Sequence, residues 1–263
     1  MLTNELKIFL PNLSNESREK MIEVAICDTR FTPTLNFNEI FSHVKNDFKK
    51  VKGLQLIMEK IMNNLLEESK KSDLENSFYL HMMPNLGIKQ GKEIMKYATE
   101  KEFGTTDIQF IIKGAIKEAG LLLLLNKYIS SKTGIYPLGE KFNVRSAPKS
   151  LNGLVKLCQE KIPTHQMPLL IGVGDTVTSV YENKTKSWLR GGSDRGFLTL
   201  IQRLGQVYQK ENQIIFVNSC NDQVSRPKVM GSDMTGISDV KDELKFNMVI
   251  SDGPDEYIEW FKE

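Results

Sequence analysis

The sequence has almost no net charge. Its 263 residues include 35 Lys and Arg against 33 Asp and Glu, so the formal net charge is only +2. A chain this close to neutrality offers no long-range field that would attract nucleic acid or an anionic membrane surface. Neither partner is expected.

Cysteine is scarce as well. Cys27, Cys158 and Cys220 are scattered and odd in number, with neither CxxC spacing nor a nearby histidine pair. This usage argues against a disulfide framework and against a zinc site. The three thiols are therefore predicted to be reduced, as in a cytosolic protein.

Long apolar runs are also missing. The longest, residues 119–125, is far shorter than the roughly 20 residues that a membrane span requires. The N-terminus shows no signal-peptide pattern, so we expect a cytoplasmic protein. What is present is an apolar content of 40%, enough to bury one large core or two modest ones.

The first 75 residues are rich in Asn, Lys and Glu and are predicted to be mostly helical. The clearest helix has apolar residues at the three-and-four spacing that places them on one face, which predicts core packing. These residues are Leu54, Ile57, Met58, Ile61, Met62 and Leu65. Residues 77–83 are predicted to form a strand that ends at the turn Pro84-Asn85, and residues 89–99 a helix.

The pattern changes after Phe103. The predicted elements of this part are, in order, a helix over 108–128, a helix over 151–162, a strand over 167–173, a helix over 195–210 and a strand over 213–218. Strand, helix and strand with short joints indicate a parallel sheet with crossover helices. We therefore expect a boundary near residues 100–107, between a helical, partly stranded first domain and an α/β second domain.

Asp175 is the most informative single residue. It stands in the segment Ile171-Gly-Val-Gly-Asp-Thr-Val-Thr-Ser179, directly after a predicted buried strand. Ligands of open parallel sheets bind beyond the carboxyl ends of the strands, and a single Asp there suits Mg²⁺. The alternative is a glycine-rich turn with an Asp helix cap. A dinucleotide fingerprint is a weaker rival, because the third glycine is absent.

Asp194 lies in Gly191-Gly-Ser-Asp-Arg-Gly-Phe197, which ends an inserted polar loop and opens the next predicted helix. Ser193 or Asp194 could simply cap that helix. Alternatively, the loop folds back and brings Asp194 beside Asp175 as a second acid. The residues alone leave both interpretations open.

Lysines follow the segment Gly104-Thr-Thr-Asp107, first Lys113 and then Lys117 in Lys117-Glu-Ala-Gly120. A lysine buried beside developing phosphate charge acts as a fixed countercharge in phosphoryl transfer. The ordinary alternative is a solvated surface lysine. His43, His81 and His165 have no partners in the sequence and receive no role.

Eight segments together resemble the glucosylglycerol-phosphate phosphatases, the cyanobacterial salt-tolerance phosphatases of the haloacid dehalogenase superfamily. They are Asn76-Ser-Phe, His81 with Pro84-Asn-Leu-Gly87, Gly91-Lys-Glu-Ile94, Gly104-Thr-Thr-Asp107, Lys117-Glu-Ala-Gly120, Tyr136-Pro-Leu-Gly-Glu140, Gly172-Val-Gly-Asp-Thr-Val-Thr-Ser179 and Gly191-Gly-Ser-Asp-Arg195. They occur in order over nearly the whole stretch 76–205.

The resemblance implies an α/β fold: a haloacid-dehalogenase-like parallel sheet with helices on both faces, incomplete here, plus an α+β cap domain. Residues 1–106 would be the cap and 107–263 the C-terminal part of the core. By the same resemblance Lys117 steadies nucleophile and phosphate, and Asp175 is the Mg²⁺ ligand with Asp194 as a candidate second acid. The implied substrate-binding residues are Asn85, Thr105, Thr106 and Asp107.

The superfamily forms an aspartyl-phosphate on an Asp of a DxD motif that precedes the cap. This chain contains no such motif, and its nearest look-alike, Cys27-Asp28-Thr29-Arg30, lacks the second Asp. We therefore expect the nucleophile segment to be missing. The chain would then be a fragment, a product with a misassigned start, or a shortened descendant.

The function implied by the resemblance is hydrolysis of glucosylglycerol 3-phosphate to glucosylglycerol, a compatible solute, with Mg²⁺ as cofactor. The expected partners are this small sugar phosphate and, through association, the glucosylglycerol-phosphate synthase or the missing N-terminal segment. The alternative is a non-catalytic remnant that binds a sugar phosphate or a partner protein.

Overall fold

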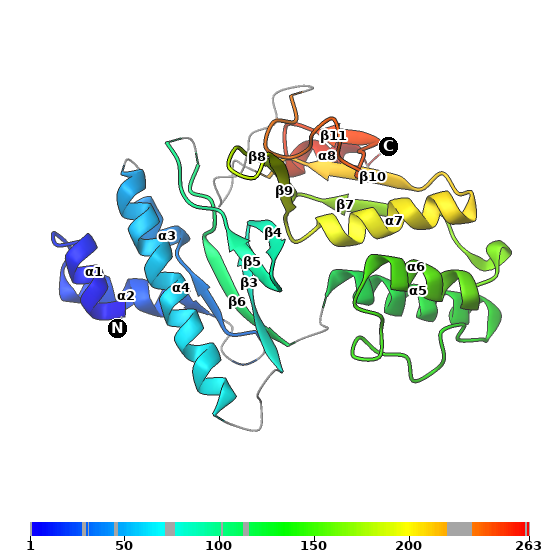
Figure 1. Cartoon of the computed structure of the whole chain (residues 1–263), viewed down its shortest axis with the longest axis horizontal. Coiled ribbons are helices and arrows are strands. Elements are labelled where there is room, and N and C mark those ends of the chain that lie inside the picture. The colour runs from blue at the N-terminus through cyan, green and yellow to red at the C-terminus, as the bar shows by residue number, and fades with distance from the viewer. Residues whose placement is uncertain are drawn as a thin grey trace. The chain divides into compact units, whose positions relative to one another are not determined.

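The computed structural model describes residues 2–27, 30, 32–44, 47–71, 77–100, 102–112, 116–219, 233–260 and 262 (Figure 1). These residues form two compact units. Unit 1 holds the described residues of Met1–Ile112 and Thr178–Gly192, with Ser219. Unit 2 holds the described residues of Lys113–Val177, Ser193–Asn218 and Val229–Glu263.

Unit 1 combines helices with an antiparallel sheet. The helices are α1 (Leu2–Phe9), α2 (Asn15–Ala25), α3 (Asn38–Ser42) and α4 (Phe48–Lys70). The four-stranded sheet has the order β1 (Ile26–Cys27), β2 (Thr34–Asn36), β6 (Asp107–Ile112) and β3 (Phe78–Met83). Every neighbouring pair in it is antiparallel. The predicted strand over 77–83 is thus confirmed as β3.

Helix α4 closes the core of unit 1. Asp47 caps it by accepting a hydrogen bond from the backbone N–H of Lys50 at 3.1 Å. The predicted apolar face is largely confirmed, because Leu54, Met58 and Met62 are buried in one hydrophobic cluster. Leu65, at the end of the predicted face, is exposed instead.

Two hairpins complete unit 1. One joins β4 (Asn85–Lys89) to β5 (Lys92–Met95), and the other joins β8 (Thr178–Glu182) to β9 (Ser187–Gly191). The helix predicted over 89–99 is therefore wrong. Gln90 and Gly91 both have positive φ, which is the backbone conformation of a two-residue hairpin turn rather than of a helix.

The helix predicted over 108–128 is also wrong in its first part. Residues 107–112 form β6, which pairs with β2 on one side and β3 on the other. The segment is rich in isoleucine, which favours a strand when two partner strands are available. The helix that follows, α5, begins only at Lys117 and ends at Thr133.

Unit 2 is built on a parallel sheet of order β11 (Met248–Ile250), β10 (Gln213–Val217) and β7 (Ile171–Gly174). Its other helices are α6 (Leu151–Lys161), the short 3₁₀ helix η1 (Thr164–Gln166), α7 (Arg195–Tyr208) and α8 (Pro254–Trp260). Helix α7 packs along β7 (Figure 1) and buries Leu198, Ile201 and Leu204. The helices predicted over 151–162 and 195–210 and the strand over 213–218 are confirmed, while the strand over 167–173 begins only at Ile171.

The predicted α/β class with a parallel sheet is confirmed. The cap over residues 1–106 and the core over 107–263 stay a prediction. The boundary between the two units falls after Ile112, and the segment 178–192 belongs to unit 1. In the described part of the chain, no helix has the length and apolarity to cross a membrane.

Two of the three cysteines can be placed. Cys27 and Cys158 are free thiols, and Cys220 lies outside the described residues. Burial raises the pKa of Cys158 to about 12, so its thiol stays protonated at neutral pH. Such a thiol packs as a small apolar side chain and is not a nucleophile.

Gln55 is a buried polar centre in α4, and it generates a prediction about stability. Its amide accepts a hydrogen bond from Ala98 N–H at 2.9 Å and donates to Phe103 O and Thr105 O, each at 2.8 Å. Gln55→Ala would leave these buried groups unsatisfied, so we expect it to lower the free energy of unfolding by about 2 to 4 kcal/mol. Asn64→Ala, at an exposed position of the same helix, should change it by less than about 0.5 kcal/mol. Urea unfolding measures both, and equal losses would contradict the prediction.

Candidate active site

Asp175 lies at the carboxyl end of β7, as the sequence predicted. Its Oδ1 accepts a hydrogen bond from the hydroxyl of Thr176 at 2.7 Å, and its side chain is only partly buried. The preceding Gly174 allows a close approach, since a Cβ there would lie 2.9 Å from the Cβ of Asp194. The strand end is thus shaped to receive a second acidic residue.

Asp194 is that second residue. Its Oδ2 accepts hydrogen bonds from the backbone N–H groups of Asp175 and Thr176, each at 2.9 Å. Although Asp194 occupies the N-cap position of α7, its side chain makes no capping hydrogen bond. The structure therefore decides between the two interpretations of this residue: the chain folds back and Asp194 lies beside Asp175. Its role as a metal ligand stays a prediction.

Lys117 begins α5 and donates a hydrogen bond through Nζ to Asp194 Oδ1. The side chain of Asp194 is 6% exposed, whereas that of Lys117 is 55% exposed. The ammonium group also lies 5.9 Å from the centroid of the Phe197 ring. Lys117 therefore compensates the charge of a buried carboxylate and remains accessible to solvent. Its role beside a phosphate stays a prediction.

The donor set fits Mg²⁺ in part. Carboxylate oxygens are hard ligands, and Mg²⁺ in proteins uses one or two of them together with water and phosphate oxygens. Asp175 presents such a carboxylate at the strand end, where its Oδ1 accepts a hydrogen bond from Thr176, and both oxygens of Asp194 accept hydrogen bonds as well. Within the described ranges, no cluster of three or more His, Cys, Asp or Glu residues could hold a metal ion by itself.

The predicted substrate-binding residues Asn85, Thr105, Thr106 and Asp107 all lie in unit 1 and are buried. Thr105 donates from its hydroxyl to Pro84 O at 2.6 Å and accepts from Lys96 N–H at 2.9 Å. The hydroxyl of Thr106 donates to Asp107 Oδ2 at 3.1 Å. These side chains tie strands and hairpin together, and their contact with a substrate stays a prediction.

Glu118 is a further acidic residue beside the start of α7, and the sequence reasoning did not select it. A Cβ on Gly196 would lie 1.5 Å from Glu118 Oε1, so this carboxylate packs on the first turn of α7. A negative charge at that position is favoured by the positive end of the helix dipole. The only signal in the sequence was its place beside Lys117, because its contact with Gly196 is set by tertiary structure.

Some predicted features lie outside the described residues. They are Asp28 and Thr29 of the nucleophile look-alike, Asn76 of the first matching segment, and Lys113.

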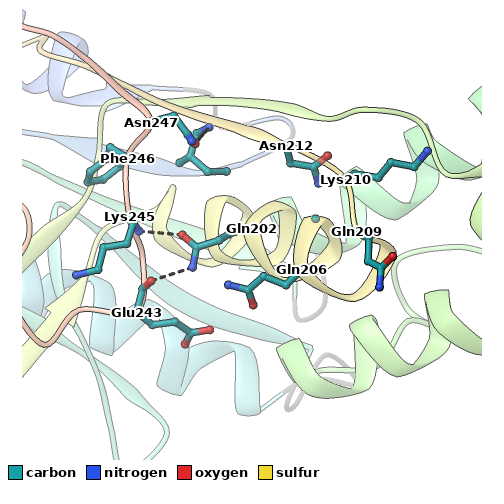
Figure 2. Close-up of a pocket in the computed structure, with 11 residues that line it drawn as sticks. Gln202, Gln206, Gln209, Lys210, Asn212, Glu243, Lys245, Phe246 and Asn247 are labelled. Carbon is teal, nitrogen blue, oxygen red and sulfur yellow. Dashed lines mark hydrogen bonds between the residues drawn. The ribbon is translucent and has the colours of Figure 1, made fainter.

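A pocket of about 420 Å³ in unit 2 lies away from these residues (Figure 2). Asn212 and Asn247, which line it, precede β10 and β11, so it lies at the amino ends of these strands, whereas Asp175 follows the carboxyl end of β7. Its polar groups are partly engaged, as Figure 2 shows for Gln202, which donates to Glu243 O and accepts from Lys245 N–H. The guanidinium of Arg203, a side chain that Figure 2 does not draw, hydrogen-bonds the Glu243 carboxylate and lowers its pKa.

A second pocket, of about 410 Å³, lies in unit 1 against the β4–β5 and β8–β9 hairpins. Its lining combines apolar, hydroxyl and charged side chains. They are Leu86, Ile88, Lys89, Ile94, Glu182, Thr185, Ser187, Trp188, Leu189 and Arg190. None of the predicted site residues lines either pocket.

The contacts of Asp194 generate a prediction about stability. Asp194→Ala would leave the N–H groups of Asp175 and Thr176 without their acceptor, so we expect it to lower the free energy of unfolding by about 3 kcal/mol. Lys117→Ala should cost only about 1 kcal/mol, because solvent reaches the half-exposed lysine position. Urea unfolding of the two variants checks the order. A larger loss for Lys117→Ala would show that the ion pair, rather than the backbone contacts, holds Asp194.

Comparisons with known proteins point to one family. The sequence model of the family described as Glucosylglycerol-phosphate phosphatase matches residues 1–263. A relative from Synechocystis sp., named Glucosylglycerol-phosphate phosphatase, is 38% identical over 279 aligned residues. The alignment covers 100% of this chain and 66% of that relative, so the chain spans just under two thirds of its length. Among solved structures, none matches the chain. The chain therefore belongs to the glucosylglycerol-phosphate phosphatase family.

Proposed function

We propose that this chain provides the magnesium- and phosphate-handling residues of a phosphatase that hydrolyses glucosylglycerol 3-phosphate to glucosylglycerol and phosphate. The observation that carries the proposal is the group of Asp175, Asp194 and Lys117 at the carboxyl end of β7, in a chain matched over its whole length by the family. A metal-binding carboxylate and a lysine are the groups that phosphoryl transfer requires to neutralise charge.

Each of the three residues has a separate task in the proposal. Lys117 holds a positive charge beside the phosphoryl oxygens. Asp194 fixes that lysine through Oδ1 and orients the backbone of Asp175 and Thr176 through Oδ2. Asp175 provides the carboxylate that would hold Mg²⁺, and the bound ion would neutralise oxygens of the transferred group. The proposal includes a contact of Asp194 with the same ion, as a second acid.

The acid that accepts the phosphoryl group is not among these three residues. The superfamily resemblance implies an Asp in a DxD motif, and the 263 residues contain no such sequence. We therefore propose that catalysis requires a segment carrying this motif in addition to the residues described.

The product proposed here is a compatible solute, so its formation would serve salt tolerance. A cytoplasmic location and an association with the synthase that makes the substrate belong to the same proposal. The location rests on the sequence features described above, and the association rests on the family.

The first prediction from this proposal concerns the metal. Asp175→Asn should weaken Mg²⁺ binding by about tenfold or more, because even the loss of an outer-shell partner costs that much at metal sites. Glu160→Gln removes an exposed carboxylate on α6 and serves as the matched control. Isothermal titration of the folded chain with Mg²⁺ measures both. Equal effects would remove Asp175 from the metal site.

The second prediction concerns activity. The 263-residue chain alone should release phosphate from glucosylglycerol 3-phosphate no faster than background, because loss of a nucleophile in a triad enzyme cost on the order of 10⁶ in turnover. A segment carrying a DxDG motif, fused or added as a separate polypeptide, should restore a Mg²⁺-dependent rate. Lys117→Ala and Asp175→Ala should each abolish that rate.

Two results would contradict this account. Rapid turnover by the chain alone would mean that an acid within it, with Asp28 or Asp107 to be tested first, is the nucleophile. No turnover after addition of the DxDG segment, with sugar phosphate still bound, would instead support a non-catalytic binding role.

A further inference from the structure

Asn85 is a buried side chain whose hydrogen-bonding capacity is fully used. It is 5% exposed. Its Nδ2 donates to Met82 O and to Glu93 Oε2, each at 3.0 Å. Its Oδ1 accepts from the backbone N–H of Gly87 at 2.9 Å and of Gly192 at 3.2 Å. A side chain with so many internal partners holds the neighbouring backbone segments in place.

Two of the contacts of Asn85 reach the open end of the β8–β9 hairpin. Thr178, the first residue of β8, donates through its hydroxyl to Asn85 O at 2.6 Å. Gly192 follows the last residue of β9 and donates its N–H to Asn85 Oδ1. Thr178 and Gly191 are paired across the hairpin. Asn85 therefore clamps both strands where the hairpin opens.

The clamp depends on close backbone contact. A Cβ on Gly191 would lie 2.2 Å from Gly87 N and 2.4 Å from Asn85 Oδ1. A Cβ on Gly87, whose φ is +95°, would lie 2.3 Å from Arg190 O. Only glycine fits at these two positions, so the backbones of β4 and β9 meet without intervening side chains.

Glu93 fixes the orientation of the Asn85 amide. Its Oε2 accepts from Asn85 Nδ2 and from Met82 N–H at 2.7 Å, while its Oε1 lies 2.8 Å from His81 Nδ1. Because this carboxylate accepts only from the amide nitrogen, Asn85 Oδ1 is directed to the N–H groups of Gly87 and Gly192. This network also gives His81 a structural setting that the sequence did not indicate.

The open end of the hairpin is continuous with the acidic residues of the site. Thr178 follows Asp175 by three positions, and Gly192 precedes Asp194 by two. The two segments remain hydrogen-bonded past the hairpin, since Asp194 N–H donates to Thr176 O at 3.1 Å, one residue out of the register that pairs Thr178 with Gly191. A slip of one residue in such a ladder turns every side chain to the other face. Because Asp175 and Asp194 lie within three residues of Thr178 and Gly192, the hairpin register held there limits where the two acids can meet.

We propose that Asn85 is a positioning residue: it locks the register of the β8–β9 hairpin at its open end and thereby the placement of Asp194 against Asp175. This differs from the substrate contact that the sequence resemblance implies for Asn85. The inference rests on the proposed function only for its effect on catalysis, while its structural part can be tested independently.

Amide hydrogen exchange on the full 263-residue chain tests the structural part. In Asn85→Ala and in Thr178→Val, the amides of Asp175, Thr176 and Asp194 should exchange about tenfold or more faster than in the parent, because buried groups of the clamp lose their partners. Exchange in α6 should not change in either variant. Thr178→Ser keeps the hydroxyl and should restore parental exchange.

Asn126→Ala is the matched control. Asn126 is also a buried amide that bridges backbone groups, donating to Gly139 O at 3.0 Å and accepting from Leu138 N–H at 2.9 Å, but it does not contact the hairpin. Its loss should leave the amides of Asp175, Thr176 and Asp194 as in the parent. If Asn85→Ala does not fold, the comparison of Thr178→Val with Thr178→Ser decides.

Unchanged exchange at Asp175, Thr176 and Asp194 in folded Asn85→Ala, which loses the side-chain contacts, or in folded Thr178→Val, which loses the bond to Asn85 O, would overturn the proposal, as would equal acceleration by Asn126→Ala. In the chain supplied with a DxDG segment, Thr178→Val should lower kcat about tenfold with little change in KM, and Thr178→Ser should restore it. If the parent chain is inactive even with the DxDG segment, the proposed function fails. Hydrogen exchange still decides the role of Asn85.

Discussion

The candidate site depends on the hydrogen bonds of one buried carboxylate, that of Asp194. Burying a charge is costly unless donors surround it, and here two backbone N–H groups and the ammonium of Lys117 provide them. These donors come from the end of β7 and from the start of α5, while Asp194 itself precedes α7. One side chain therefore fixes three elements of unit 2 relative to each other, and it leaves the carboxylate of Asp175 at the strand end.

Unit 1 relies on the same physical principle, with neutral amides in place of a charge. Gln55 connects α4 to the segment between β5 and β6, and Asn85 connects β4 to the β8–β9 hairpin. Buried amides of this kind are stable only when every donor and acceptor has a partner. They therefore specify one arrangement of the irregular segments, which apolar packing alone leaves open.

The β8–β9 hairpin gives the molecule its unusual chain path. It is inserted between Asp175 and Asp194, yet its residues belong to unit 1. Asp175 lies just before the chain leaves unit 2, and Asp194 lies just after the chain returns to it. In the proposed phosphatase, the residues that handle phosphate would thus be linked, through the chain itself, to unit 1, which contains the residues predicted to form the cap.

The sequence by itself determined the elements whose signals are local. The apolar face of α4, the helices α6 and α7 and the strand β10 follow from the periodicity of a few neighbouring residues, and the position of Asp175 follows from the strand before it. The same reasoning failed for β5 and β6. A turn at Gln90-Gly91 and pairing with partner strands outweighed the helical pattern there, and neither is visible in a short window.

Only the tertiary structure decided what the candidate site residues contact. Asp194 could cap a helix or join Asp175, and the choice depended on N–H groups 18 and 19 positions away and on a lysine 77 positions away. Likewise, the sequence marked Asn85 as important but not that its partner Thr178 lies 93 positions along the chain. Hydrogen bonds between distant segments form only after the chain has folded, so no local pattern records them.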